Sequence, residues 1–169
     1  MSRAELQSQQ SNMAAAERGV RAVIAWLAAA ALVVAPPVLR VALAVPFFRS
    51  GLTRWDGFLS LSPSTAYLFE EEFKLHIFGG IYDFPAPVVM AHLTGLAEIT
   101  LPVLLVFGLA TRFAALGLLI MTGVIELVFP EVWATFHLPW AAMAIAIIAL
   151  GPGVLSLDHL VERRFPKGT

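Results

Sequence analysis

The chain has 169 residues and a formal net charge of −1, and 59% of its residues are hydrophobic while only 14% are charged. A soluble domain usually has about 45–50% apolar and about 25% charged residues, so this composition excludes a soluble globular protein, and the charge excludes a basic nucleic-acid-binding surface. The absence of cysteine excludes a disulfide, a thiolate metal site or a dithiol relay formed by this chain alone.

The apolar residues occur in long blocks, and they predict an all-α integral membrane protein. At about 20 residues per span, the chain can form a four-helix bundle with an additional N-terminal apolar or interfacial helix. We expect a disordered cytoplasmic tail over residues 1–16, because this stretch is polar and has no periodic pattern. A single membrane domain is predicted over residues 17–160, followed by a basic cytoplasmic tail over residues 161–169.

The first apolar block runs from Val20 to Phe48, which is too long for one untilted span and too short for two. Pro36 and Pro37 remove two helical donors and disfavour a helix at the residue before them. We therefore expect one helix over residues 18–35, either in the membrane interface or extending the first span, and a first full span over about 37–55.

Residues 56–86 form a long connection between the first two spans. Ser62 followed by Pro63 is a helix-start signal, and residues 64–78 mix aromatic and acidic side chains. This pattern predicts a short helix at the membrane surface that ends at the two glycines of positions 79–80.

Three further spans are predicted, over residues 87–108, 113–129 and 137–151. A tight turn before Arg112 joins the second span to the third, and Pro130 ends the third. The Gly151-Pro152-Gly153 break ends the fourth. Lys and Arg residues are more frequent on the cytoplasmic side of a membrane. Seven of them fall in the two termini and in the turn between the second and third spans. Three are counted with the loop after the first span: Arg49, Arg54 and Lys74. Both termini are therefore expected in the cytoplasm.

Glu98 lies in the middle of the second predicted span, where an ionised group costs several kcal/mol unless it is paired or hydrated. We expect its carboxyl to face the bundle, either as a proton-handling or ligand-binding group or as a hydrogen-bonded anchor between helices. His92 is six residues earlier and about 120° away on a helix, so the two do not form a metal site by themselves. His92 is a candidate hydrogen-bond partner for a quinone.

Arginines in and beside the first span also need partners. Arg40 is expected at headgroup level, where its side chain can reach water, and Arg54 at the opposite interface. Arg49 lies deeper and cannot be neutralised by deprotonation. We predict that Arg49 pairs with Glu98 or Glu126, with Glu98 preferred; the alternative is that Arg49 extends outward to lipid headgroups or to the acidic loop.

Other polar residues support weaker interpretations. Glu126 and His137 are expected at the interface. Glu72 and His76 would share a face of a helix, and they are weak candidates for a divalent-cation site, which needs at least a third ligand; a solvated acidic face is the simpler reading. Asp158 follows the glycine break and is placed to cap a short terminal helix or to pair with an arginine on the cytoplasmic side.

Four motifs in this order and spacing resemble the DoxX family. They are residues 48–54 (FRSGLTR), Glu98, residues 108–117 (GLATRFAALG) and residues 151–158 (GPGVLSLD). The resemblance covers about residues 37–160. Arg40, Gly51 and Arg54 match the family pattern, although the last position is usually Lys, while Arg49 and the long N-terminal apolar segment lie outside it.

The resemblance implies a four-helix protein of the bacterial inner membrane. The family takes its name from subunits of a terminal or thiosulfate:quinone oxidoreductase, and some relatives occur beside redox partners or beside proteins that make metal-binding peptides. It implies no agreed catalytic set, so the chain would be at most a non-autonomous subunit of an oxidoreductase. No haem, flavin or iron–sulfur signature is present, and quinone is the cofactor that the resemblance suggests.

Three functions follow from these observations. The first is a membrane subunit or accessory component of a quinone-linked redox system, acting with a protein partner. The second is a non-enzymatic membrane partner in a metal or oxidative stress response, which docks a protein or handles a small ligand. The third is a structural assembly factor. A homo-oligomer would also help to bury the polar groups inside the membrane.

Overall fold

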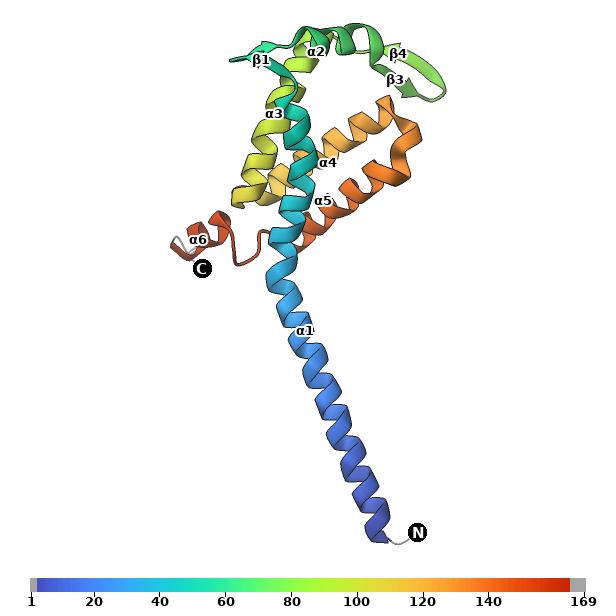
Figure 1. The fold of residues 1–169 in the computed structure, drawn as a ribbon, viewed down its shortest axis with the longest axis vertical. Coiled ribbons are helices and arrows are strands. Elements are labelled where there is room, and N and C mark those ends of the chain that lie inside the picture. Colours follow the sequence, from blue (N-terminus) through green and yellow to red (C-terminus); the bar gives the residue numbers. More distant parts are fainter. Residues whose placement is uncertain (1–2, 165–169) are drawn as a thin grey trace, which may run out of the picture. The chain divides into compact units, whose positions relative to one another are not determined.

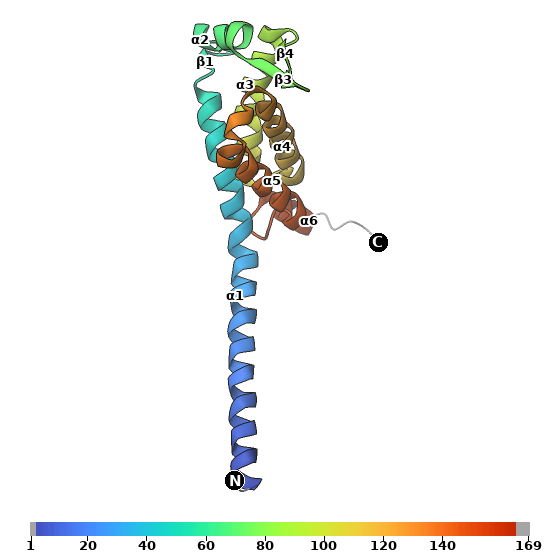
Figure 2. The same ribbon diagram turned by 90° about the vertical axis from the view of Figure 1, so that its right-hand side faces the viewer.

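The structure is a computed structural model that describes residues 3–164 (Figures 1 and 2). The chain divides into two units, Met1–Ala35 and Pro36–Thr169, and the second of them contains the helical bundle and every site discussed below. The long helices are α1 (Arg3–Leu52), α3 (Pro87–Phe107), α4 (Thr111–Val128) and α5 (Leu138–Leu150), followed by the short α6 (Leu157–Arg164).

The first 50 described residues form one helix, α1, which corrects two predictions. The disordered tail is wrong from Arg3 onward, because α1 begins there; residues 1–2 lie outside the described residues. The split before Pro37 is also wrong, since α1 continues through both prolines. Proline is tolerated inside membrane helices where neighbouring groups satisfy the freed carbonyls. The apolar stretch over residues 18–35 therefore belongs to the same helix as the first predicted span.

The four predicted membrane spans are confirmed by length and composition. The apolar helices cover Ala15–Leu52, Pro87–Phe107, Thr111–Val128 and Pro130–Leu150. The fourth begins earlier than predicted, because two short turns, η2 (Pro130–Val132) and η3 (Trp133–His137), lead directly into α5. The chain is thus a multi-pass membrane protein.

Residues 53–86, which we call the cap segment, connect α1 to α3 and contain the only strands of the described chain. Its elements are β1 (Trp55–Gly57), β2 (Ser60–Leu61), α2 (Pro63–Tyr67), η1 (Leu68–Glu72), β3 (Lys74–Ile77) and β4 (Gly80–Asp83). The two pairs β1–β2 and β3–β4 are antiparallel hairpins. The all-α prediction is therefore approximate.

The helix start in the cap segment is confirmed, but the predicted surface helix over residues 64–78 is too long. Ser62 caps α2 by accepting a hydrogen bond from the Thr65 backbone N at 3.2 Å. Helical structure ends at Glu72, and the next residues pair as strands from Lys74 opposite Asp83 to Ile77 opposite Gly80. β-branched and aromatic residues favour strands, and Phe78 and Gly79 form the turn between β3 and β4 rather than a helix end.

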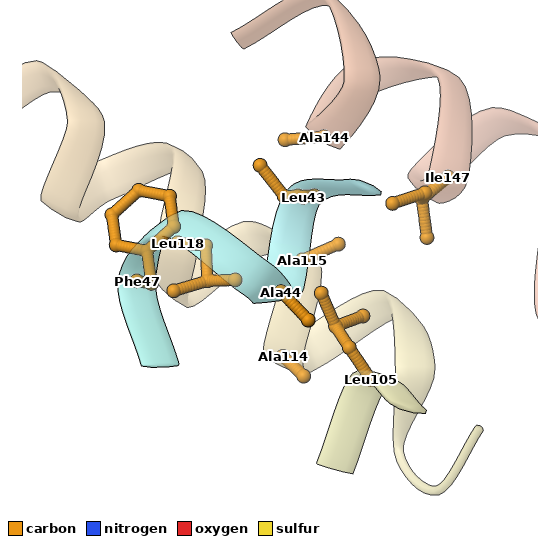
Figure 3. Close-up of a cluster of buried hydrophobic side chains, with 9 residues drawn as sticks. All are labelled: Leu43, Ala44, Phe47, Leu105, Ala114, Ala115, Leu118, Ala144 and Ile147. Atoms are coloured by element: carbon orange, nitrogen blue, oxygen red, sulfur yellow. The ribbon is translucent and has the colours of Figure 1, made fainter. Parts of the chain in front are cut away.

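The core of the bundle is built from small and branched side chains of four helices (Figure 3). Alanines from α1, α4 and α5 allow the helices to approach closely, as is usual between membrane helices. Larger side chains fill the space between them. The cluster consists of Leu43, Ala44, Phe47, Leu105, Ala114, Ala115, Leu118, Ala144 and Ile147. It packs the C-terminal part of α1 against α3, α4 and α5.

Candidate functional site

The Glu98 carboxylate lies inside the bundle and is paired with Arg54. Glu98 is 1% exposed, which confirms that it faces the bundle. Arg54 donates from Nε to one carboxylate oxygen at 2.9 Å and from Nη2 to the other at 3.1 Å. The Ser50 hydroxyl donates a third hydrogen bond at 3.1 Å. Such a bidentate arginine–carboxylate contact is the strong and geometrically specific form of an ion pair.

The end of α1 is shaped to bring these groups together. After Leu52 the chain turns, with backbone hydrogen bonds from Thr53 N to the Ser50 carbonyl and from Arg54 N to the Gly51 carbonyl. The turn directs Arg54 back toward α3. Gly51 lies directly against α3, where an added Cβ would be 2.9 Å from the Glu98 Cβ. A larger residue at position 51 would therefore separate the two helices.

The prediction that Arg49 pairs with Glu98 or Glu126 is wrong. Arg49 is exposed, and no ion pair joins it to any of the described residues. The reason is rotational: successive residues of a helix differ by about 100°, so Arg49 faces away from the side on which Ser50 and Gly51 meet α3. The alternative prediction, an outward-directed Arg49, fits this exposure.

An apolar cavity of about 200 Å³ lies beside the ion pair. Ser50, Arg54, Thr94 and Glu98 form its polar wall, and they come from α1, the cap segment and α3. The rest of the lining is apolar. The aromatic members of this lining are Phe47, Phe69, Phe73, Phe84, Phe129 and Trp140.

Three phenylalanines of the cap segment cover the cavity and pack on one another. The ring centroids of Phe69 and Phe73 are 5.1 Å apart, and those of Phe69 and Phe84 are 5.6 Å apart. The guanidinium carbon of Arg54 lies 5.4 Å from the Phe69 ring centroid, which is within the range of a cation–π contact. The cap segment thus covers most of the ion pair, leaving the Arg54 side chain 14% and the Glu98 side chain 2% exposed.

His92 does not join this site. Its Nδ1 lies 2.8 Å from the Val88 carbonyl on the same helix, and its ring stands edge-on to Trp55 at 6.0 Å. His92 is absent from the cavity lining. As predicted, it does not share a face of α3 with Glu98.

A second pair, between the buried His137 and the half-buried Glu126, was missed by the sequence analysis. His137 is 2% exposed, and its Nδ1 lies 2.5 Å from Oε2 of Glu126. Both residues had been expected at the interface as separate groups. The signal was the short link of residues 130–136, which must bring the end of α4 next to the start of α5. The His137 ring is 5.7 Å from Trp140, a lining residue of the cavity.

The weak metal-site interpretation of Glu72 and His76 is wrong in its geometry. The two residues would share a helix face only if the helix continued, but β3 begins at Lys74. Glu72 accepts a hydrogen bond from the Tyr67 hydroxyl, and His76 Nδ1 lies 3.2 Å from the Leu127 carbonyl. Among the described residues, no group of three His, Asp or Glu side chains could hold a metal ion.

Arg40 and Asp158 connect separate segments of the chain at the opposite end of the bundle. Arg40 is 2% exposed and donates from Nη2 to the Leu155 carbonyl at 2.5 Å, so the prediction that it reaches the headgroups is wrong. Its guanidinium lies against Gly108, whose φ of +68° and lack of a Cβ permit the contact. Arg112 is exposed at this end, beside Gly151.

Asp158 caps a helix, but a different one from the terminal helix predicted. Its carboxylate accepts hydrogen bonds from the backbone N of Ala110 at 2.8 Å and of Thr111 at 2.9 Å, and from the Thr111 hydroxyl at 2.8 Å. These groups form the N-terminus of α4, where a negative charge is favoured. Burial raises the pKa of Asp158, but the hydrogen bonds from Thr111 and Ala110 outweigh it, and the net pKa is lowered.

A family model described as DoxX matches residues 35–131, more than half of the chain. This chain belongs to the DoxX family. It is similar to an uncharacterized protein of Haemophilus influenzae, with 29% identity over 151 residues, which covers 76% of this chain and 84% of the relative. No solved structure matches the chain. The matched segment contains Arg54, Glu98 and every residue of the cavity lining except Trp140.

Proposed function

We propose that this DoxX protein is a membrane component of a quinone-linked redox system and that a quinone ring binds in the cavity beside Arg54 and Glu98. The observation that supports it best is the combination of an aromatic-lined space with a polar wall inside a membrane-spanning bundle. Small-molecule sites are concave and mostly apolar, with a few polar groups that orient the ligand.

The size and the chemistry of the cavity fit such a ring. An apolar cavity of about 150 Å³ can hold benzene, so about 200 Å³ leaves room for a ring with small substituents. Phe47 and Trp140 form one side, with ring centroids 5.0 Å apart. Offset and edge-on contacts between aromatic rings stabilise such packing. A bound quinone would supply reversible two-electron, two-proton redox chemistry.

The polar wall would orient the ring. The Thr94 hydroxyl lines the cavity and makes no hydrogen bond to another described residue, so it is a free donor for a ligand carbonyl. The Glu98 carboxylate already accepts three hydrogen bonds. We assign it the role of holding the guanidinium of Arg54 against the cavity. The pair as a whole is neutral, which suits a neutral ligand in a dry site.

Binding should be lost when the cavity is filled. We expect the purified wild-type protein to retain or rebind a quinone stoichiometrically, and Ile125→Trp to bind none, because Ile125 lines the cavity and the larger ring would occupy it. The measurement is extraction and chromatography of bound quinone, followed by titration with a short-chain quinone in lipid nanodiscs.

Two matched variants control for nonspecific effects. Ile120→Trp places the same side chain on an exposed position of the same helix and should bind like the wild type. Thr94→Val should weaken binding by up to about tenfold, the value of one hydrogen bond, whereas Thr100→Val, an exposed position of α3, should not. Absence of bound quinone in the wild type, or equal binding by Ile125→Trp, would contradict the proposal.

The orientation of the chain is part of the same proposal. We infer that it lies in a bacterial inner membrane with both termini in the cytoplasm, because seven Lys and Arg residues fall on that side, against Arg49 near the end of α1 and Arg54 and Lys74 in the cap segment. Topology reporters fused after residue 60 and after residue 169 should report opposite sides of the membrane. Reports from the same side would overturn the four-span arrangement.

A quinone-linked role needs a protein that supplies or removes electrons, so we include a redox partner in the proposal. The alternative is a non-enzymatic partner in a metal or oxidative stress response. The acidic residues of the cap segment support it, but no ligand-binding group among the described residues does. Quinone binding lost on filling the cavity would favour the first of these two functions.

A further inference from the structure

The two hairpins of the cap segment end in fully exposed phenylalanines. Phe58 at the β1–β2 turn is 96% exposed and Phe78 at the β3–β4 turn is 106% exposed. The turns hold Leu59 at φ +55° and Phe78 at φ +49°, a backbone region that residues other than glycine, asparagine and aspartate rarely adopt. Glycine would avoid this strain, so large apolar side chains at these tips call for a physical reason.

The first hairpin begins beside α3, one of the apolar helices long enough to cross a membrane. Trp55, the first residue of β1, packs on α3 so closely that an added Cβ on Gly95 would be 2.7 Å from its ring. Gly95 is eight residues from the start of α3, or about 12 Å along the helix. The start of the β1–β2 hairpin therefore contacts α3 well inside the apolar helix rather than at its first turn.

The second hairpin lies at the end of α4. His76 of β3 is bonded through Nδ1 to the carbonyl of Leu127, the residue before the last of α4, and the Phe73 and Phe129 rings are 5.4 Å apart. Figures 1 and 2 show the β3–β4 hairpin extending sideways from the bundle rather than continuing the direction of the helices. Its tip therefore points away from the bundle axis, beside the end of α4.

Charge is separated from the tips. Residues 57–61 and 75–82 contain no Asp, Glu, Lys or Arg. The single basic residue of the second hairpin, Lys74, is paired with Asp83 at its base at 2.7 Å. The exposed acidic residues are Asp56 in β1, Asp83 at the end of β4, and Glu70, Glu71 and Glu72 on the helical turn between the hairpins.

We propose that Phe58 and Phe78 insert into the lipid bilayer at the boundary between headgroups and acyl chains and anchor the cap segment to the membrane. Aromatic rings are favoured at this boundary. The lateral direction and the depth of the hairpins favour lipid over a soluble partner, which would approach from the water. Because Phe69 and Phe73 of the same segment cover the cavity, the anchors hold the cover over the site whatever its ligand.

The chain has no cysteine, so single-cysteine variants can be spin-labelled without further substitutions. Phe58→Cys and Phe78→Cys would be labelled with a nitroxide in the full-length protein, in vesicles of phosphatidylethanolamine and phosphatidylglycerol. Collision with oxygen, which concentrates in lipid, is compared with collision with a water-soluble nickel chelate. Glu71→Cys is the aqueous control, and Ile120→Cys, which is exposed in the middle of α4, is the lipid control.

We expect both tip labels to favour oxygen over the nickel chelate, at a shallower depth than the label at position 120. A label at either tip that favours the chelate as strongly as position 71 would overturn the proposal, because that tip would then lie in water. Immobilised tip labels that neither reagent reaches would also overturn it, since a protein partner or a second copy would then cover the tips.

Discussion

Replacing Glu98 by glutamine is expected to lower the free energy of unfolding by about 3–5 kcal/mol, the usual cost of removing one partner of a buried ion pair. The Arg54 side chain is only 14% exposed and the Glu98 side chain 2%. Without the carboxylate, the guanidinium would remain charged in an apolar site, because arginine does not deprotonate. The measurement is equilibrium unfolding by SDS titration in mixed micelles.

A double-mutant cycle identifies the partner of Glu98. Glu98→Gln and Arg54→Gln should show a coupling energy of at least about 1 kcal/mol, as expected for residues in direct contact. Arg49→Gln is the matched control: it changes an exposed arginine of the same region, should alter stability by less than about 0.5 kcal/mol, and should add independently to Glu98→Gln. Coupling to Arg49 and additivity with Arg54 would refute the observed pairing.

Replacing Asp158 by alanine is expected to lower the free energy of unfolding by about 1.5–3 kcal/mol, the range for hydrogen bonds to a charged group. The carboxylate holds the N-terminus of α4 through three hydrogen bonds from Ala110 and Thr111. The Asp158 backbone N also bonds to the Gly108 carbonyl, so the side-chain variant isolates the cap. Glu162→Ala, an exposed position of α6, should leave the unfolding midpoint unchanged.

The stabilisation by Asp158 should depend on pH in a defined direction. Its folded-state pKa is lowered from the ordinary value of 3.8, so the folded state binds its proton less readily than the unfolded state. The contribution is therefore complete above pH 3.8 and is lost as the pH falls through the lower, folded-state pKa. The difference in stability between the wild type and Asp158→Ala should narrow in that acidic window. A difference that widens there would contradict the cap.

The sequence was sufficient to predict the buried carboxyl but not its partner. Glu98 stands out because an acid in the middle of an apolar span must face other protein groups. Whether Arg49 or Arg54 reaches Glu98 depends on where α1 ends and how the chain turns after Leu52. The turn of two residues that follows α1 brings Arg54, and not Arg49, to α3. Helical depth alone, on which the prediction rested, carries no information about that turn.

Contacts between segments that are distant in the sequence could not be predicted from local sequence patterns either. Arg40 was expected in the headgroups because it lies near the end of a predicted span, but α1 continues beyond it and the Gly108 turn covers it. The β3–β4 hairpin was read as helix because its aromatic and acidic residues fit a helical pattern until Gly79. The cavity could not be predicted, since its lining comes from four helices and the cap segment.

The most direct measurement of the central claim is photolabelling with a quinone that carries a small photoreactive group on its ring, followed by peptide mass spectrometry. If the ring occupies the cavity, the label is expected on peptides that contain Phe69, Thr94, Ile125 or Trp140, and an excess of unmodified quinone should prevent the labelling. Labelling confined to lipid-facing positions such as Ile120, with no protection by unmodified quinone, would show that the ring does not bind beside Arg54 and Glu98.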